Sequence, residues 1–498
     1  MNLHFNSKIN FSDTSKIIAV IIVIFLYGYL QLHNLGKEQI KIWDEAWKVN
    51  NAYEMLHTGN ILNSTYNYEL DTWNTKPPLL IWCIALSWKI SGYSELAIRL
   101  PGAIAIFLLL LILILFYKKI LNETLPGMLT IIILLTIQGF NHYHVTRIGD
   151  PEPLLILFTT AYLLSFLRIY FSESRGTNKN WLHLTFFIIC AFFTKGIAGL
   201  IPLSGILFFL SLKPQRLVSF FSDKKLYIAG ISVLLFVSIY YFISYLNNPL
   251  YIQAVLKNEV GLYKEGMEGW IKHPSHWYYL NYIYKEGVAG YFYIFFISLI
   301  SGLFSKNYRL RITTLYAFIV SLALIVIYSS GTVKNQWYIA SIYPLVAIII
   351  ANGIITVVKW VISRFSWLER FELLITLLIT LAVAKKSFDN ISDRPNSHLQ
   401  KVYLPEREGA AMRYYWHKVD TLNTYIVVTN KNSQNYFYQR FLNEQKGKNI
   451  TMYEHTDSLK PRDVVLLCQE ELIKELQSKC SYDTIEVVPS GGILTRIK

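Results

Sequence analysis

The chain has 498 residues, 53% of them hydrophobic and 15% aromatic, and a formal net charge of +14. Apolar runs close to the ~20 residues that cross ~30 Å of hydrocarbon recur from residue 17 to residue 384, which excludes a soluble enzyme and predicts a polytopic membrane protein. The Lys and Arg residues are scattered over short loops between these runs, so membrane topology explains the charge better than a nucleic-acid partner does.

The first run, Ile17 to Leu32, predicts a membrane span. It is long for the apolar part of a signal peptide and no small-residue cleavage site follows it, so we expect it to be retained. Lys8 and Lys16 precede it. The positive-inside rule therefore places the N-terminus in the cytoplasm and the next segment on the outer face.

A polar first outer loop, residues 36–98, follows this span. It carries Asp44 and Glu45 near its start and Lys76 further on, directly before two prolines. A carboxylate at the membrane boundary can take a proton from an acceptor hydroxyl, and a lysine can hold a lipid phosphate. Acidic residues after a first span are also common as plain loop residues. Whether Asp44 and Glu45 belong to a catalytic site therefore depends on the rest of the chain. Short interfacial helices are predicted over residues 45–56 and 79–90.

The later apolar runs bring the predicted number of spans to roughly eleven. The run 181–212 is too long for one span and is broken at Thr194-Lys195-Gly196, which places Lys195 in an outer turn. Every basic cluster between runs then falls on the cytoplasmic side, which is the strongest internal check on the topology. The better-defined of the other runs are 99–116, 125–140, 226–245, 312–328, 337–358 and 371–384.

This topology gathers polar residues from several loops on the outer face. They are Asp44, Glu45, Lys76, Arg147, Asp150, Lys195 and Lys334. Two of the lysines, Lys195 and Lys334, could equally well snorkel at the ends of spans. Arg147 could instead pair with Glu95 and hold two loops together.

Two further outer-loop features stay open. His142 and His144 have the chemistry of metal ligands, but two histidines in a loop are more often plain loop residues. A divalent metal is therefore an open requirement, and no other cofactor is expected. The long outer loop 247–285, rich in Tyr, Trp, Glu and Lys, suits a segment that covers a substrate.

The composition changes after residue 384, and residues 400–498 show the patterning of a soluble domain. Strands are predicted over 425–428 and 464–467, and helices over 406–415 and 470–476. We therefore expect a transmembrane domain, residues 1–384, and a small α/β domain, residues 385–498, on the outer side. A disulfide between Cys468 and Cys480 stays open, because their spacing cannot show how closely they approach.

Five ordered motifs resemble one known family. They are Trp43-Asp44-Glu45, Thr75-Lys76-Pro77-Pro78-Leu79 with Glu95…Arg99-Leu100-Pro101, Thr146-Arg147-Ile148-Gly149-Asp150-Pro151-Glu152, Phe193-Thr194-Lys195-Gly196 and Tyr343-Pro344-Leu345. Over about residues 16–384 the chain resembles the bacterial aminoarabinose transferases and the dolichyl-phosphate-mannose protein mannosyltransferases. One departure is that family members often carry an arginine near residues 258–264, where this chain has none; Lys264 or Lys272 could replace it.

The resemblance implies an all-α polytopic fold of the type C glycosyltransferases and an inner-membrane enzyme with a polyprenyl-phosphate sugar donor, of the undecaprenyl-phosphate type. It implies Asp44 and Asp150 as the catalytic carboxylates and Lys76 as a ligand of the donor phosphate. Substrate contacts are expected from Glu45, Lys76, Arg147, Lys195, Lys334 and Tyr343. A single displacement helped by one carboxylate favours inversion at the anomeric carbon.

The acceptor stays open between lipid A, another glycolipid and a protein. A protein O-mannosyltransferase is accordingly the nearest alternative. A transporter or a sensor is a more distant one, because transporters usually place charged residues near the middle of the bilayer. In this chain the apolar runs are almost free of charge.

Overall fold

The computed structural model describes residues 20–172, 176–261, 273, 275–392, 406–418, 423–429 and 432–498. Four lysines named above lie outside the described residues: Lys8 and Lys16, on which the predicted orientation rests, and Lys264 and Lys272, the possible replacements for an arginine. The chain divides into two compact units, described separately below. The helical unit comprises residues Met1–His33, Leu70–Leu80 and Pro101–Arg394, and the mixed unit comprises Asn34–Glu69, Ile81–Leu100 and Pro395–Lys498. The first outer loop, predicted as part of the transmembrane domain, thus clusters mainly with the C-terminal residues.

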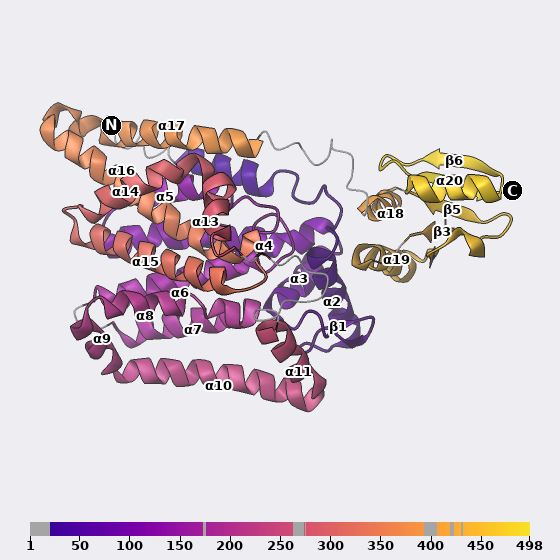
Figure 1. The fold of residues 1–498 in the computed structure, drawn as a ribbon, viewed down its shortest axis with the longest axis horizontal. Coiled ribbons are helices and arrows are strands. Elements are labelled where there is room, and N and C mark those ends of the chain that lie inside the picture. The colour runs from indigo at the N-terminus through magenta and orange to yellow at the C-terminus, as the bar shows by residue number, and fades with distance from the viewer. Residues whose placement is uncertain are drawn as a thin grey trace, which may run out of the picture. The chain divides into compact units, whose positions relative to one another are not determined.

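The helical unit is a bundle of mostly long apolar helices (Figure 1). The helix α4 (Glu95–Phe116) enters it from the mixed unit. Its other helices are η1 (Gly28–Leu32), η2 (Tyr117–Leu121), α5 (Leu125–Thr136), α6 (Glu152–Tyr170), α7 (Asn178–Lys195), η3 (Gly196–Gly199), α8 (Leu203–Ser211), α9 (Pro214–Phe221), α10 (Lys224–Asn247), α11 (Leu250–Leu256), η4 (Lys257–Gly261), α13 (Tyr278–Tyr282), η5 (Ile283–Gly287), η6 (Ala289–Tyr291), α14 (Phe292–Leu303), α15 (Tyr308–Ser330), η7 (Gln336–Ile342), α16 (Tyr343–Arg364), η8 (Ser366–Phe371) and α17 (Glu372–Ser392).

Six described helices are long and apolar enough to cross a membrane, or seven if the bent pair Tyr278–Gly287 and Ala289–Leu303 forms one span. Shorter apolar helices cover Val20–Leu32, Leu79–Ser91, Leu125–Thr136 and Leu374–Lys385. A multi-pass membrane protein is therefore confirmed, whereas the total of roughly eleven spans stays a prediction.

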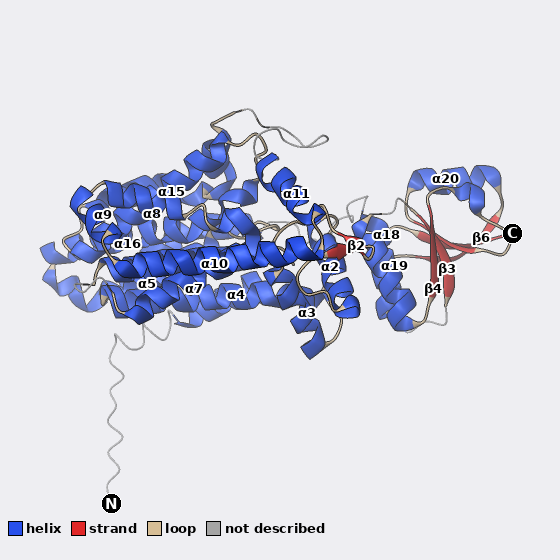
Figure 2. Cartoon of the chain, turned by 90° about the horizontal axis from the view of Figure 1, so that it is seen from below, coloured by secondary structure: helices blue, strands red, loops and turns tan. Residues whose placement is uncertain are grey.

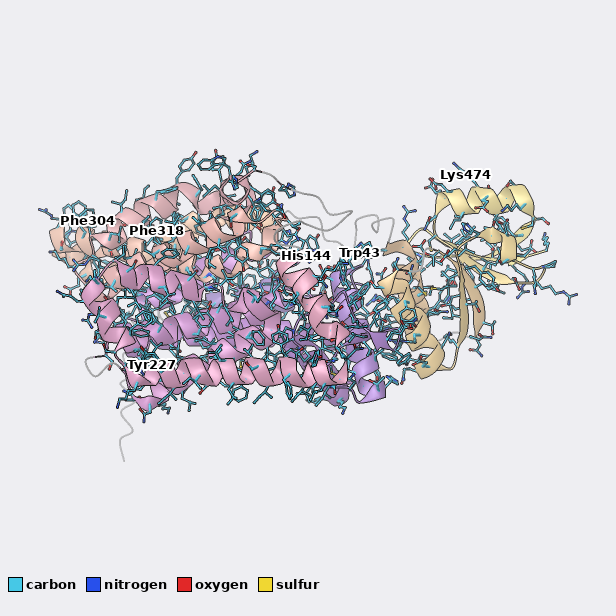
Figure 3. All side chains as sticks on the ribbon, turned by 60° about the horizontal axis from the view of Figure 1, so that its bottom comes forward. Trp43, His144, Tyr227, Phe304, Phe318 and Lys474 are labelled. Carbon is cyan, nitrogen blue, oxygen red and sulfur yellow. The ribbon has the colours of Figure 1, made fainter. Side chains whose placement is uncertain are left out.

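The long helices pack side by side. Helix α7 lies between α6 and α10, α15 packs on α8 and α16, and α16 also contacts α5 and α14. Most of α10 is left exposed, with apolar side chains such as Tyr227 projecting from it (Figure 3). An apolar helix that exposes this much surface is stable when lipid covers it.

Two helix ends differ from the predicted ones for local reasons. Helix α4 begins at Glu95, before the predicted start at Arg99, because the Ser94 hydroxyl accepts a hydrogen bond from the Ala97 N–H and caps the helix. Helix α5 ends at Thr136 rather than Phe140, because the Asn141 amide donates to the carbonyl oxygens of Leu135 and Ile137. Side-chain bonds of this kind satisfy backbone groups that helix ends leave without partners.

The predicted break at Thr194-Lys195-Gly196 is confirmed. Helix α7 ends at Lys195, and Gly196 follows with φ +59°, a conformation that residues with a Cβ rarely adopt. A Cβ at this glycine would contact Pro77 Cδ at 3.6 Å. The break therefore brings the end of α7 against the segment that follows Lys76.

The mixed unit contains a five-stranded sheet in the order β4-β3-β5-β7-β6. β3 is parallel to β4 and β5, whereas β7 is antiparallel to β5 and β6. α20 lies on one face of the sheet, and α18 and α19 lie on the other (Figure 2). The elements of this unit are α2 (Asp44–Thr58), β1 (Thr65–Tyr66), β2 (Glu69–Leu70), α3 (Leu79–Ser91), α18 (Arg407–His417), β3 (Thr424–Val428), α19 (Ser433–Lys446), β4 (Asn449–Tyr453), η10 (Thr456–Ser458), β5 (Val464–Leu467), α20 (Glu470–Lys479), β6 (Tyr482–Val487) and β7 (Ile493–Ile497).

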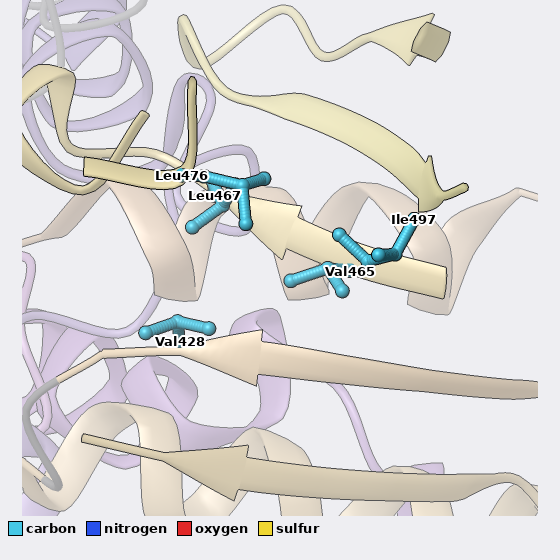
Figure 4. Close-up of a cluster of buried hydrophobic side chains, with 5 residues drawn as sticks. All are labelled: Val428, Val465, Leu467, Leu476 and Ile497. Carbon is cyan, nitrogen blue, oxygen red and sulfur yellow. The ribbon is translucent and has the colours of Figure 1, made fainter. Parts of the chain in front are cut away.

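The core under α20 is apolar and consists of Val428, Val465, Leu467, Leu476 and Ile497 (Figure 4). Burying each of these side chains stabilises the fold by roughly 1.5–3 kcal/mol. The two strands and the two helices predicted for this domain are present. Cys468 and Cys480 are both free thiols, so the structure has no disulfide between them.

Charged side chains join the first outer loop to the C-terminal residues within the mixed unit. Arg440 on α19 donates to the Glu54 carboxylate on α2 at 2.6 Å, and the two side chains are 7% and 0% exposed. The guanidinium also lies 4.7–5.1 Å from the ring centroids of Tyr53, Tyr68 and Tyr436. A desolvated cation between three aromatic rings is held by cation–π attraction as well as by its carboxylate.

Replacing Arg440 with Leu should lower the free energy of local opening of α2 and α19 by about 3–5 kcal/mol, because Glu54 would keep a buried charge without its cation. Hydrogen exchange of the two helices in the full-length protein measures this. In the double variant Glu54→Gln/Arg440→Leu, this free energy should fall clearly less, because no buried charge is left without a partner. The control is Lys498→Ala, which breaks an ion pair with Asp483 whose two side chains are 55% and 66% exposed. This variant should lower stability by at most about 1 kcal/mol. Equal losses in the single and double variants would contradict the ion-pair account.

Candidate active site

Lys76 stands at the end of the first outer loop, just before Pro77-Pro78 and α3. Its ammonium pairs with the Glu259 carboxylate on η4, and its side chain keeps 30% of its surface exposed. The surrounding backbone is held by the outer segment, because Tyr251 Oη donates to the Thr75 carbonyl at 3.0 Å and Asn258 donates to the Thr72 carbonyl at 2.8 Å. Lys76 is thus a positioned, partly accessible cation.

Asp150 is buried two residues before the start of α6 and bonds to a histidine. Its Oδ2 lies 2.9 Å from His144 Nδ1, and the two side chains are 3% and 11% exposed. The imidazole stacks on Trp337 with 3.9 Å between ring centroids. A carboxylate on one ring nitrogen fixes the orientation of the ring. This pair has the composition of an acid–base centre.

A second ion pair lies next to Asp150. Lys195, the last residue of α7, pairs with Glu152, the first residue of α6; Glu152 is buried and Lys195 is partly buried. Glu152 is close enough to Asp150 and His144 to interact electrostatically. Lys195 Nζ also lies 5.4 Å from the ring of Tyr338, which neighbours Trp337 on η7.

The two lysine pairs belong to one polar cluster in the helical unit. Gly196 follows Lys195 in the sequence. A Cβ added at Gly196 would lie 3.6 Å from Pro77 Cδ and 3.9 Å from a carboxylate oxygen of Glu259. The cluster therefore brings together three predicted residues, Lys76, Asp150 and Lys195. It adds three that the sequence analysis did not assign to a site: His144, Glu152 and Glu259.

Arg147, predicted to bind substrate, instead holds the end of the first helix. Its guanidinium donates to the carbonyl oxygens of Leu30 at 3.2 Å and His33 at 2.7 Å, where the helix dipole is negative. Its own backbone has φ +65°, an uncommon conformation for a residue with a side chain. Its predicted alternative partner, Glu95, pairs with Arg413 in the mixed unit.

Lys334 and Tyr343 are also surrounded by other parts of the protein. Lys334 is 2% exposed and donates to the carbonyl oxygens of His273 and Gly331, both at 2.6 Å. Burial lowers the pKa of its ammonium. Tyr343 is fully buried, and its ring lies against Gly139, where a Cβ would overlap with the Tyr343 hydroxyl. Neither geometry supports the predicted substrate contacts, which stay predictions.

The mixed unit carries the other predicted carboxylates. Asp44 begins α2, keeps 40% of its side chain exposed and accepts a hydrogen bond from Lys48 at 3.1 Å. Glu45 is fully buried, and its oxygens accept from Arg99 at 2.7 and 2.8 Å and from the Lys41 N–H at 2.7 Å. These bonds give the buried carboxylate of Glu45 its partners, and its predicted substrate contact stays a prediction.

Backbone strain occurs beside both predicted catalytic carboxylates. Trp43, one residue before Asp44, has φ +70° and ψ −105°, and Arg147, three residues before Asp150, has φ +65°. Such conformations cost roughly 1–3 kcal/mol each and cluster at functional sites. The two loops are thus held in shapes that local sequence preference alone would not choose.

Two of the additional residues had signals in the sequence. Glu152 and His144 lie close in the sequence to Arg147 and Asp150, which were already assigned to the outer face. Glu259 could not be singled out, because 183 positions separate it from Lys76 in the sequence. The possible metal role of His144 also stays a prediction; it and Asp150 supply two of the donor atoms that a divalent cation would use.

Residues 75–241 match the family model of dolichyl-phosphate-mannose-protein mannosyltransferases. An uncharacterized protein of Aquifex aeolicus (strain VF5) is 26% identical over 340 residues, which cover 68% of this chain and 63% of the relative. ArnT from Cupriavidus metallidurans bound to undecaprenyl phosphate has a TM-score of 0.66 at 13% identity, covering 96% of this chain and 97% of ArnT.

AglB from Archaeoglobus fulgidus, an oligosaccharyltransferase in complex with an inhibitory peptide and a dolichol-phosphate, has a TM-score of 0.52 at 11% identity. The match covers 88% of this chain and 64% of AglB. These structural likenesses show the fold, and the sequence match to the family model includes Lys76, Asp150 and Lys195. The predicted resemblance is confirmed: residues 75–241 match the mannosyltransferase family model, and the chain has the fold of ArnT.

Proposed function

We propose that the chain transfers a sugar from a polyprenyl-phosphate donor to an acceptor at the outer face of the inner membrane. The observation that carries the proposal is the cluster of Lys76, Lys195 and the Asp150–His144 pair at the ends of apolar helices. The bound lipids of ArnT and AglB, undecaprenyl phosphate and dolichol-phosphate, support a donor of this class.

Of the two lysines, Lys76 is the better ligand for the donor phosphate. Lys195 is 12% exposed and paired with a carboxylate that is 2% exposed, so freeing it would leave a buried charge. Lys76 is 30% exposed and stands directly before Pro77-Pro78, which precede the apolar helix α3. A lysine ammonium there can hold a phosphate as a point charge.

In the proposed reaction, the bond between the anomeric carbon and the phosphate oxygen breaks while the acceptor oxygen bonds to the same carbon. The electron pair of the broken bond stays on the phosphate, whose charge Lys76 stabilises. The acceptor hydroxyl gives its proton to Asp150 or Asp44. Attack opposite the leaving group inverts the anomeric centre. The participation of Asp44, which belongs to the other unit, is part of the proposal.

A transporter fits the charges less well. In the described spans, Glu152 and Lys195 stand at the first and last positions of their helices rather than near the middle. Substrate sites of transporters typically lie near the bilayer midplane, within broken helices. The enzyme proposal accounts for the same residues without a charge in the middle of a span.

Two candidate functions differ in their acceptor. The first is transfer to lipid A or another glycolipid, and the second is O-mannosylation of protein. The name of the matching family model and the peptide bound to AglB favour the second candidate. The match to ArnT, bound to undecaprenyl phosphate, concerns the lipid donor and leaves both acceptors open. Mass spectrometry of envelope glycolipids and glycoproteins from a deletion strain tests both. A sugar lost from either class identifies the acceptor, and an unchanged profile in both contradicts the proposal.

The outer-face location predicts a labelling pattern. In a background without the four native cysteines, a cysteine at Lys474, exposed on α20 (Figure 3), should react with a membrane-impermeant thiol reagent in cells with a permeable outer envelope. A cysteine at Lys213, also exposed, should react only after the inner membrane is opened. The reverse pattern would place the site on the cytoplasmic face and contradict the proposal.

A further inference from the structure

The ligand of Lys76 in this structure is the carboxylate of Glu259. Glu259 keeps only 9% of its side chain exposed, and its Oε1 contacts the lysine ammonium. It is carried by η4, directly after α11, within the outer loop that the sequence analysis expected to cover a substrate. The residue that the proposed function uses to bind phosphate is therefore already occupied by an internal anion.

A donor phosphate and Glu259 cannot both neutralise Lys76 at low cost. Two anions a few ångströms apart in a partly buried place repel each other strongly, because the local dielectric is well below that of water. Lys195, the other cation of the cluster, is paired with Glu152 and cannot offset this repulsion without exposing that carboxylate. Phosphate binding therefore has to move or outcompete Glu259.

The pair is not needed to attach the outer segment to the loop before Lys76. Tyr251 bonds to the Thr75 carbonyl, and Asn258 bonds to the carbonyl oxygens of Thr72 and Trp73 at 2.8 and 3.1 Å. None of these bonds uses Lys76 or Glu259. The ion pair between Glu259 and Lys76 is therefore additional to the bonds that hold the segment in place.

We propose that Glu259 is an internal competitor of the lipid phosphate for Lys76. The inference rests on the proposed role of Lys76 and adds a residue that sets how tightly the site holds the lipid phosphate. The polyprenyl monophosphate left after transfer keeps its phosphate on Lys76, so a carboxylate that returns to the lysine favours its release. The donor carries the same phosphate, and Glu259 weakens its binding as well.

The test measures binding of undecaprenyl phosphate to the purified full-length protein in detergent at fixed salt. Glu259→Gln removes the charge at nearly constant shape and should tighten binding by about tenfold. Glu259→Asp keeps the charge and should tighten it much less. The matched control is Glu286→Gln, which neutralises an exposed carboxylate on η5, just after this outer loop, and should change affinity less than twofold.

Unchanged or weaker binding in Glu259→Gln would overturn the inference, because the carboxylate would then orient Lys76 for phosphate instead of competing with it. Equal tightening in Glu286→Gln would also overturn it, since the effect would be one of overall charge. Lys76→Ala separates the two proposals. If that variant binds the lipid as the parent does, the phosphate role of Lys76 fails and the inference fails with it. If Lys76→Ala binds weakly and Glu259→Gln does not tighten, only the inference fails.

Discussion

Replacing Asp150 with Asn should lower the rate of sugar transfer by about 10²–10⁴-fold while the protein stays folded, because a positioned acid–base group contributes about that much to catalysis. The amide oxygen of Asn can still accept from His144 Nδ1, so the stacking of the imidazole on Trp337 should persist. The loss should appear in kcat, with a smaller change in KM. The rate of sugar transfer in detergent measures both.

The same substitution at Asp44 should have an effect of similar size if the two carboxylates act in one site. Glu69→Gln, which changes an exposed carboxylate on β2, is the matched control and should keep normal turnover. Near-normal turnover in Asp150→Asn would remove this residue from the mechanism. A loss confined to Asp150→Asn would leave Asp44 with only a structural role, as the first residue of α2 bonded to Lys48.

Lys76→Ala should weaken donor binding by about 10–100-fold and slow transfer as well, because a hydrogen bond to a charged group contributes roughly 1.5–3 kcal/mol. Lys76→Arg should recover only part of this, since a planar guanidinium cannot place its charge as an ammonium does. Donor affinity and turnover for both variants, measured in detergent, check the prediction.

The alternative for Lys76 is that it only anchors α3 in the headgroup layer, which Arg would do equally well. Full activity in Lys76→Arg together with a modest loss in Lys76→Ala would favour that anchor. Because Lys76→Ala leaves Glu259 buried without its lysine, hydrogen exchange of η4 and α11 should accompany the assay. Broad loss of protection there would indicate a folding defect rather than a lost phosphate ligand.

The helices were predictable where hydrophobic length or a strong local signal defined them. The break at Gly196 and the start of α3 after Pro77-Pro78 follow from residues that restrict the backbone locally. The ends of α4 and α5 were missed because single side-chain bonds, from Ser94 and Asn141, set them. Such bonds compete with apolar periodicity and shift an end by a turn.

The site was predictable in its residue types but not in its pairings. Lys76, Asp150 and Lys195 come together because loops that follow or precede spans meet at the ends of those spans. The partner of Lys76, and the bonds of Glu45 to Arg99 and of Glu54 to Arg440, join residues far apart in the sequence. Only tertiary packing decides whether a loop carboxylate faces a substrate or a buried arginine, so the bonds of Glu45 to Arg99 could not be predicted from the sequence.

The most direct measurement follows the lipid product. Polyprenyl-phosphate sugars extracted from the organism's own membranes are incubated with the purified protein and an envelope extract as acceptor, and polyprenyl monophosphate is quantified by mass spectrometry. The account predicts that monophosphate accumulates with the parent protein and an acceptor, and that Asp150→Asn forms it at least about a hundredfold more slowly. Donor lipids that stay unconverted by the parent protein, or that are converted equally fast by Asp150→Asn, would contradict it.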